Sequence, residues 1–463
     1  MELIISNEIT IKDPTPEVRE WVYDKLKVAN PEYSKKVRLG LWVGNTPKDI
    51  ALYRNSGSDL IIPHGVKDSL LYAFPELNIN GSFEHPVLFN YASNKPVNYN
   101  ANINLYDYQK DALNSLVRSR GGILQSKAGS GKTRVGIALA CALGKKTLWL
   151  THTNELLNQS YNAAAEFIDK KLLGKITAGK MQIADGITFA TVQTLSKSDL
   201  NALRYEWDMI IVDECHRASM SVTKATMFSK VLNNLAARYK YGLSATLHRA
   251  DGLIKCTYAL IGGVAYTVPD SVVNTMQVRI ERKDTGVKIS RACLDTDGTL
   301  VYAKLINYLA EHICRNVMIA SDIARLASDK NSVILLSDRV EHLKRLYDLL
   351  PLEYQNDAVI LHGKVKKADR ELALEQMRNK EKHILLATYQ LAKEGLDVPC
   401  LDRLLLATPV KDYAIVVQSV GRIARVCEGK GEPVVYDYVD DIGFLEGMWK
   451  KRCTSYRKDG CIL

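Results

Sequence analysis

The segment of this chain best suited to chemistry is a glycine-rich octapeptide, Ser126-Lys127-Ala128-Gly129-Ser130-Gly131-Lys132-Thr133. It lies between a short apolar run and a helix-like apolar stretch over residues 135–143. Glycines let a loop aim several backbone N–H groups, and the positive end of the next helix, at a polyphosphate. Lys132 would reach the terminal phosphates and Thr133 would hold magnesium. The segment predicts a nucleotide-binding loop, with an ordinary glycine-rich turn as the alternative because Ser126 replaces the usual first glycine.

A second candidate site is a pair of carboxylates, Asp213 and Glu214, directly after the apolar run 209–212. A buried strand that ends in acids places them at the carboxyl edge of a sheet, where ligands of doubly wound folds bind. There Asp213 can support the magnesium ion and Glu214 can polarise the attacking water, the two tasks of nucleotide hydrolysis. A solvated turn is the alternative for the pair alone. Its place about eighty residues after the glycine-rich loop favours the catalytic interpretation.

The elements that must position these residues alternate between apolar strands and helices. Strand candidates in the first region are 147–150, 187–190, 209–212 and 241–243, and the rhythm restarts with 333–336, 359–361, 384–387, 404–407 and 434–436. Such alternation predicts an α/β fold with parallel sheets flanked by helices. We expect two such lobes, at 101–275 and 331–463, with a connecting segment at 276–330.

Residues 1–100 have a different pattern and predict a small N-terminal α+β domain. Apolar and polar residues alternate over 3–11, 37–43 and 59–62, which predicts short strands. Thr15-Pro16 opens a helix whose apolar residues, from Val18 to Leu26, fall on one face.

Composition narrows the class of protein. The 463 residues suit two or three domains, and a net charge of +10 favours a polyanionic partner, with solubility as the alternative explanation. The nine cysteines contain no C-x-x-C pair, so we expect no zinc, no disulfide framework and a reducing compartment. The start lacks the features of a signal peptide, and no apolar run reaches the roughly 18 residues of a membrane span. We therefore expect a soluble, intracellular protein with no membrane partner.

Three motifs, in this order, resemble those of superfamily-two helicases and translocases. They are Asp213-Glu214-Cys215-His216, Ser244-Ala245-Thr246 and Gln418-Ser419-Val420-Gly421-Arg422-Ile423-Ala424-Arg425. The chain is most similar to the phage UvsW and XPB branch of that group, over about residues 103–440. The resemblance implies that the two lobes are tandem RecA-like domains that use ATP and magnesium.

The resemblance also implies roles for residues around the nucleotide. Gln109 would lie near adenine, Ser244 and Thr246 would couple hydrolysis to lobe movement through His216, and Arg422 and Arg425 would act as arginine fingers. Guanidinium groups suit the charge that develops on a transferred phosphoryl group. The other positions implied to contact the nucleotide are Gly129, Gly131, Gly395, Asp397 and Gln418.

Contacts to nucleic acid are implied for six residues: Thr151, Thr191, Gln193, Thr194, Arg249 and Thr388. Hydroxyls and backbone amides at strand ends can hold phosphates without reading bases. Each threonine-rich loop has a helix cap as its alternative. The tail, residues 449–458, mixes cations with aromatics, which suits either a DNA-gripping end or a frayed, solvated helix.

These observations predict an ATP-dependent DNA helicase that translocates on DNA and remodels or unwinds forked or branched DNA in recombination, repair or replication. The N-terminal domain would contact duplex at a fork through the cations Lys35, Lys36, Arg38 and Lys48, close to Trp42. Three alternatives stay open: a double-stranded DNA translocase, an RNA helicase and a non-catalytic nucleic-acid-binding protein. The host cytoplasm is expected if the chain is of phage origin, and the residues indicate no particular protein partner.

Overall fold

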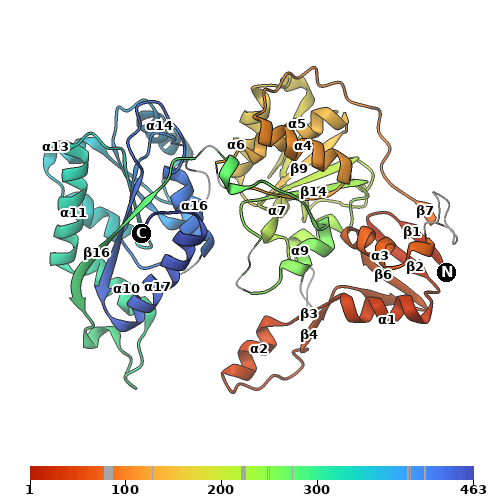
Figure 1. The fold of residues 1–463 in the computed structure, drawn as a ribbon, viewed down its shortest axis with the longest axis horizontal. Coiled ribbons are helices and arrows are strands. Elements are labelled where there is room, and N and C mark those ends of the chain that lie inside the picture. Colours follow the sequence, from red (N-terminus) through yellow and green to blue (C-terminus); the bar gives the residue numbers. More distant parts are fainter. Residues whose placement is uncertain are drawn as a thin grey trace. The chain divides into compact units, whose positions relative to one another are not determined.

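The structure is a computed structural model, and it describes residues 1–77, 87–127, 129–220, 226–247, 249, 251–273, 275–393, 396, 398–410 and 413–463. The described residues form two compact units, one from most of residues 1–273 and the other from residues 274–463. Figure 1 shows each unit as helices packed on β-sheet. None of the helices in these ranges combines the length and apolar character needed to cross a membrane.

An eight-stranded sheet, ordered β11-β10-β12-β9-β13-β14-β8-β15, is the framework of the first unit. All neighbouring strands run parallel except β10 and β11. The strands are β8 (Gly122–Gln125), β9 (Thr147–Thr151), β10 (Leu173–Thr177), β11 (Lys180–Gln182), β12 (Ile187–Thr191), β13 (Met209–Asp213), β14 (Tyr239–Ser244) and β15 (Val264–Thr267). The helices are α4 (Asp107–Ser119), α5 (Lys132–Leu143), α6 (Asn154–Ala165), α7 (Val192–Leu195), α8 (Met227–Leu232) and α9 (Ile254–Ile261).

Helices cover both faces of this sheet, which explains why its central strands β9, β12 and β13 are buried at every position. In β13, for example, Ile211 joins a core with α4, α5 and α6, whereas its neighbour Ile210 joins a second core with α7, α8 and α9. Successive side chains of a strand point to opposite faces, so a strand buried on both faces has no polar alternation. Because the strands are parallel, their carboxyl ends share one edge. The ends of β9, β12, β13 and β14 therefore lie in a row there.

The N-terminal residues build a separate five-stranded sheet, ordered β5-β6-β2-β1-β7, within the same unit. The elements are β1 (Glu2–Ile5), β2 (Glu8–Lys12), α1 (Pro16–Lys25), β3 (Lys27–Ala29), α2 (Pro31–Arg38), β4 (Asp49–Ala51), β5 (Arg54–Ser56), β6 (Asp59–Pro63), α3 (Lys67–Ala73) and β7 (Val87–Phe89). Its apolar core also takes in Cys256 and Ala259 of α9. Buried polar contacts join it to the large sheet, because Lys240 of β14 donates to the Asn7 carbonyl at 3.0 Å.

The second unit contains a six-stranded parallel sheet, ordered β16-β21-β20-β17-β19-β18. Its strands are β16 (Arg279–Lys288), β17 (Val333–Ser337), β18 (Ala358–Leu361), β19 (Ile384–Thr388), β20 (Arg403–Leu406) and β21 (Val434–Asp441). Its helices are α10 (Tyr302–Glu311), α11 (Ile313–Ser328), α12 (Val340–Asp348), α13 (Leu352–Asp357), α14 (Lys367–Arg378), α15 (Tyr389–Lys393), α16 (Tyr413–Ile423) and α17 (Gly443–Lys458). Residues 276–330, expected to connect two lobes, supply β16, α10 and α11 of this unit.

The α/β fold with a small N-terminal α+β part is confirmed, and so are the strand candidates of both lobes. One local expectation is wrong, and so is one of the two alternatives for the tail. Residues 37–43 form the end of α2 and a turn instead of a strand, because Asn30 caps a helix that begins at Pro31. The tail is not a frayed helix: in α17 the buried Arg452 guanidinium donates to both carboxylate oxygens of Asp437, at 2.7 and 2.8 Å.

Candidate nucleotide site

The glycine-rich loop joins the carboxyl end of β8 to the start of α5. Gly129 and Gly131 have φ values of 84° and 78°, a left-handed conformation that side chains other than glycine rarely adopt. A Cβ atom at Gly131 would overlap the side-chain amide of the buried Gln109. The sequence therefore needs glycine here for two reasons, backbone conformation and close approach. Gln109 is held beside the loop, and its contact with the base stays a prediction.

Lys132 is the first residue of α5, and its ammonium lies over the loop. Its Nζ donates to the carbonyls of Ser126 and Lys127, each at 3.0 Å. Burial disfavours the ionised form of both Asp213 and Glu214, and the lysine charge opposes this effect, so it acts on the acidic pair as well. Thr133 follows on the same first turn of α5. Its hydroxyl and the Asp213 carboxylate are the oxygen ligands that magnesium prefers, so the donor set fits that ion.

The two acids occupy the last position of β13 and the residue after it. Glu214 has φ 49° and ψ 48°, a left-handed conformation that costs a non-glycine residue of the order of 1–3 kcal/mol. The Glu214 amide donates to Asp213 Oδ1 at 3.0 Å, and Ser160 of α6 donates to Asp213 Oδ2 at 3.5 Å. Both carboxylates therefore lie at the end of β13.

Burial and mutual repulsion set the ionisation of the pair. Burial, and then the negative charge of Glu214, raise the pKa of Asp213 above its ordinary value. Burial alone would also raise the pKa of Glu214, but His216 and the Lys132 charge outweigh it and lower that pKa. Glu214 is therefore ionised and can accept a hydrogen bond from water. Of the two acids, Asp213 is the one whose ionised form a nearby cation would stabilise more.

A row of close polar contacts runs from Glu214 past His216 to the end of β14. His216 Nδ1 lies 3.3 Å from Glu214 Oε2 and 3.0 Å from Ser244 Oγ. The Ser244 hydroxyl donates its one hydrogen to the Thr246 carbonyl at 2.6 Å, so we assign His216 Nδ1 as the protonated donor. The structure thus brings together all three residues that the resemblance implies for coupling.

Arg249 makes intramolecular contacts at the same edge. It forms a two-pronged ion pair with Asp251, at 2.9 and 2.6 Å, and donates to the His216 carbonyl at 2.6 Å. The hydrogen bonds from Arg249 lower the pKa of Asp251. Arg249 therefore links the segment after Ser244 to the backbone beside the acidic pair.

The threonines predicted to hold nucleic acid lie at strand ends on this edge, but their hydroxyls have other partners. The buried Thr151 donates to the Thr153 carbonyl at 3.1 Å. Thr191 is the N-cap of α7 and accepts from the Thr194 amide at 3.3 Å. Gln193 donates to the His152 carbonyl at 2.7 Å. The helix-cap alternative therefore describes Thr191, and a role in binding phosphates stays a prediction for all four predicted residues.

The described predicted residues of the second unit lie at one strand end, on one helix and just after that helix. Thr388 ends β19. In α16, Arg422 donates to the carbonyls of Leu396 and Ala392, at 3.0 and 3.1 Å, and Gln418 has a buried Oε1 without a hydrogen-bond partner among the described residues. Arg425 follows two residues after that helix. Gly395 and Asp397 lie outside the described residues.

Sequence reasoning missed Ser160 as a contributor to this site. It lies on α6, nine residues after Thr151, and its hydroxyl donates to Asp213. Serine at a helical position facing a strand end carries no motif of its own. The tertiary contact was the one signal that could have identified it.

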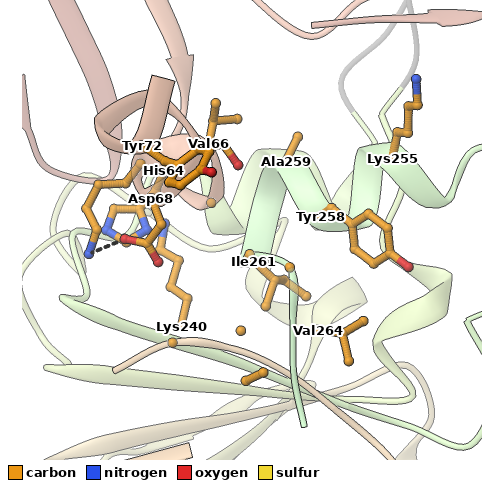
Figure 2. A pocket seen from close by; sticks show the side chains of 18 of the residues that line it. His64, Val66, Asp68, Tyr72, Lys240, Lys255, Tyr258, Ala259, Ile261 and Val264 are labelled. Carbon is orange, nitrogen blue, oxygen red and sulfur yellow. Dashed lines mark ion pairs between the residues drawn. The ribbon is translucent and has the colours of Figure 1, made fainter. Parts of the chain in front are cut away.

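A cavity of about 840 Å³ lies elsewhere in the first unit, between α1, α3 and α9. Figure 2 shows His64, Lys240 and Tyr258 among its lining residues. Gly121 and Gly122, which also line it, lie just before and at the start of β8, so the cavity adjoins the amino end of that strand. None of the predicted site residues in the described part of the chain lines it, so it is distinct from the candidate nucleotide site.

The fold and the site together define a class: tandem RecA-like α/β lobes with a phosphate-binding loop. Comparison with known families narrows this class. Residues 102–249 match the family model described as the Type III restriction enzyme, res subunit, and residues 309–427 match the helicase conserved C-terminal domain. The two matches together cover more than half of the chain. The chain belongs to the superfamily-two helicases, and the resemblance inferred from its motifs is confirmed.

Individual relatives agree with that family. A protein of Acanthamoeba polyphaga mimivirus, named as an ATP-dependent RNA helicase, is 29% identical over 73% of this chain and 64% of its own length. The ATP-dependent DNA helicase uvsW of Enterobacteria phage T4 is 26% identical over 74% of this chain and 70% of its own length. A solved structure, the ATP-dependent Type ISP restriction-modification enzyme LlaBIII bound to DNA, shares the fold with a TM-score of 0.55 and 17% identity, over 76% of this chain and 30% of that one.

Proposed function

We propose that this protein is an ATP-dependent DNA helicase that translocates on DNA and remodels or unwinds forked or branched DNA. One observation carries the proposal most: His216 Nδ1 lies 3.3 Å from the Glu214 carboxylate and is hydrogen-bonded to Ser244 Oγ at 3.0 Å. This arrangement links Glu214, which is suited to activating water, with Ser244 at the end of β14. A protein that only binds nucleotide has no need of such a link. Membership of the helicase family supports the same conclusion.

Different residues around the glycine loop and the acidic pair have different roles in hydrolysis. The glycine loop and Lys132 bind the phosphates, since they offer backbone N–H groups and a cation at a helix start. Thr133 and Asp213 would hold magnesium, which when bound neutralises phosphate charge. Glu214, being ionised, orients the attacking water. When the phosphates change, a shift of the Glu214 carboxylate acts on His216 through their charge contact and reaches Ser244 through the His216 hydrogen bond.

We further propose that Arg422 and Arg425 stabilise the charge that develops on the same nucleotide. Arg422 is anchored by two carbonyls of its own unit, at 3.0 and 3.1 Å, which fixes the direction of its guanidinium. A cation held in fixed geometry stabilises a transition state better than a mobile one. Gln418, with its buried and unpartnered carbonyl oxygen, is proposed to contact the nucleotide from the same helix.

DNA is the proposed nucleic-acid substrate because the T4 relative is named as a DNA helicase and the LlaBIII structure is of a DNA complex. RNA is the second candidate, since the mimivirus relative is named as an RNA helicase. Phosphate contacts alone do not distinguish the two sugars. The deciding experiment compares stimulation of ATP turnover by single-stranded DNA, duplex DNA, forked DNA and RNA of matched length. Greatest stimulation by forked DNA, with strand separation, is the expected result. Stimulation by RNA alone would reject the DNA assignment.

The N-terminal part cannot be tested cleanly by deleting residues 1–100. Its core includes Cys256 and Ala259 of α9, and Asn7 accepts a hydrogen bond from Arg204 at 2.6 Å. Deletion would expose apolar surface of the remaining unit. Substitution of surface cations is therefore the better test of its proposed role at a fork.

A further inference from the structure

A projecting arm, residues 30–48, carries α2 between the two strands of a small sheet, β3 and β4. Figure 1 shows α2 beyond these strands, away from the five-stranded sheet. No side chain from residue 31 to residue 49 is buried, and all of these residues are described. The arm therefore contributes nothing to an apolar core. Polar contacts must hold it in one shape.

Specific hydrogen bonds hold the arm in one shape. The Asn30 amide donates to the Lys48 carbonyl at 2.9 Å, and the Asn30 side chain donates to the Pro47 carbonyl at 2.9 Å. Lys36 Nζ donates to Thr46 Oγ1 at 2.6 Å across the arm. The two ends and the middle of the arm are thus fixed, so its surface is presented in a defined geometry.

Apolar side chains gather at the end of the arm without cover. Trp42 is 87% exposed, and Val37, Leu39 and Leu41 are each more than half exposed. The indole lies beside Gly44, where a Cβ atom would come 2.8 Å from its Cζ3 atom. Exposed apolar groups that cluster, as these do, mark an interaction surface.

Positive charge surrounds this apolar end. Residues 30–48 contain four cations, Lys35, Lys36, Arg38 and Lys48, and one acid, Glu32. Glu32 lies 3.3 Å from Lys36, which leaves three cations without an acidic neighbour in the arm. A mainly apolar protein partner would gain nothing from these charges. An exposed aromatic ring among cations is instead the arrangement that binds unpaired nucleic acid, by stacking on bases and contact with phosphates.

We propose that the arm binds an unpaired segment of nucleic acid, with one base stacked on Trp42 and its phosphates next to Lys35, Arg38 and Lys48. The inference takes nucleic acid as partner from the proposed function and adds the site and the mode of contact. DNA and RNA share this chemistry, so both belong in the test. The site requires no nucleotide, because it lies apart from the residues of the phosphate-binding loop.

Tryptophan fluorescence tests the stacking directly. Of the five tryptophans, all in described residues, Trp42 is the one whose side chain is mostly exposed. Addition of an oligothymidylate or oligouridylate of fifteen nucleotides to the full chain, without ATP, should quench its emission. Trp42→Phe should lose most of this quenching, whereas Trp449→Phe, which removes a half-buried tryptophan, should keep it. Equal quenching in wild type and in Trp42→Phe would overturn the proposal.

Affinity measurements add an independent readout. Trp42→Ala should weaken binding of the same oligonucleotides by roughly 5- to 150-fold, the range expected for one stacked base, while Trp42→Phe retains most of the affinity. Lys35→Ala combined with Arg38→Ala should reduce the salt dependence of binding. ATP turnover without nucleic acid should be unchanged in all three. Unchanged affinity in Trp42→Ala would overturn the proposal, whereas absence of ATP turnover in the wild type would reject the proposed function and leave the stacking result standing.

Discussion

His216 Nδ1 lies 3.0 Å from Ser244 Oγ, across the ends of two neighbouring strands. The hydroxyl of Ser244 is the acceptor in this bond because its hydrogen is directed to the Thr246 carbonyl. Ser244→Ala removes the acceptor and leaves the phosphate-binding residues in place. We expect it to keep ATP turnover within a few-fold of wild type and to lower strand separation per ATP by about tenfold, the loss of one hydrogen bond.

The measurement for Ser244→Ala is the ratio of base pairs separated to phosphate released on forked DNA. Ser115→Ala is the matched control, since its hydroxyl donates to the Ala265 carbonyl away from the site. A fall of both activities by the same factor would show that Ser244 serves the chemistry or the fold instead of coupling.

Lys132→Ala and Glu214→Gln should fail at different steps. Lys132 lies at the loop that is proposed to hold the phosphates, so its removal should abolish both tight nucleotide binding and turnover. Glu214→Gln keeps the size of the side chain but loses the ionised acceptor for water, so binding should persist while hydrolysis falls by about 10²- to 10⁴-fold. Titration with a fluorescent ATP analogue, followed by phosphate release, separates the two. Turnover near wild type in either variant contradicts the assigned chemistry.

The sequence predicted the sheet cores well because hydrophobic patterning and burial coincide there. Strands such as 209–212 and 333–336 are continuous apolar runs, and they are buried on both faces. The glycine loop could be predicted equally well, since Gly129 and Gly131 adopt backbone angles that only glycine takes easily. In such places one local physical requirement decides the residue type.

Prediction failed where local pattern and tertiary context disagree. Val37, Leu39 and Leu41 alternate with polar residues as a strand would, yet no partner strand lies beside them and Asn30 instead caps a helix. Arg452 and Tyr456 have the sequence pattern of a solvated tail. However, both side chains donate hydrogen bonds to the buried Asp437, which lies 15 and 19 residues earlier in the chain. Neither outcome follows from the segment alone, because each depends on a contact made by another element.

The buried ion pair between Arg452 and Asp437 should be essential for the second unit. Asp437→Asn removes the charge that compensates a guanidinium with almost no solvent contact. Breaking a buried pair from one side costs about 3–5 kcal/mol, so we expect the midpoint of thermal unfolding to fall by roughly 10 °C. Asp441→Asn, an exposed acid on the same strand, is the control. Equal midpoints for the two variants, measured by calorimetry, would show that Arg452 has another partner.

Stability of the first unit should depend on pH through Lys240. Burial lowers the pKa of this lysine to about 7, and its Nζ donates to the carbonyls of Asn7 and Leu232, at 3.0 and 2.8 Å. An unfolded chain restores the ordinary lysine pKa of about 10.4. Between these two values the folded state binds fewer protons than the unfolded state. The free energy of unfolding therefore rises with pH in this window, by at most about 1.4 kcal/mol per pH unit for this group.

Substitution of Lys240 isolates this contribution from the rest of the titration. Lys240→Met should remove the rise in unfolding free energy between pH 7 and pH 9 that wild type shows, whatever its effect on absolute stability. Lys110→Met, at an exposed lysine of α4, should leave the rise intact. Urea unfolding at several pH values gives the slopes directly. The same slope in wild type and Lys240→Met would mean that Lys240 stays protonated in the fold. In that case the two carbonyls and the nearby Glu8 would compensate its charge more fully than its burial suggests.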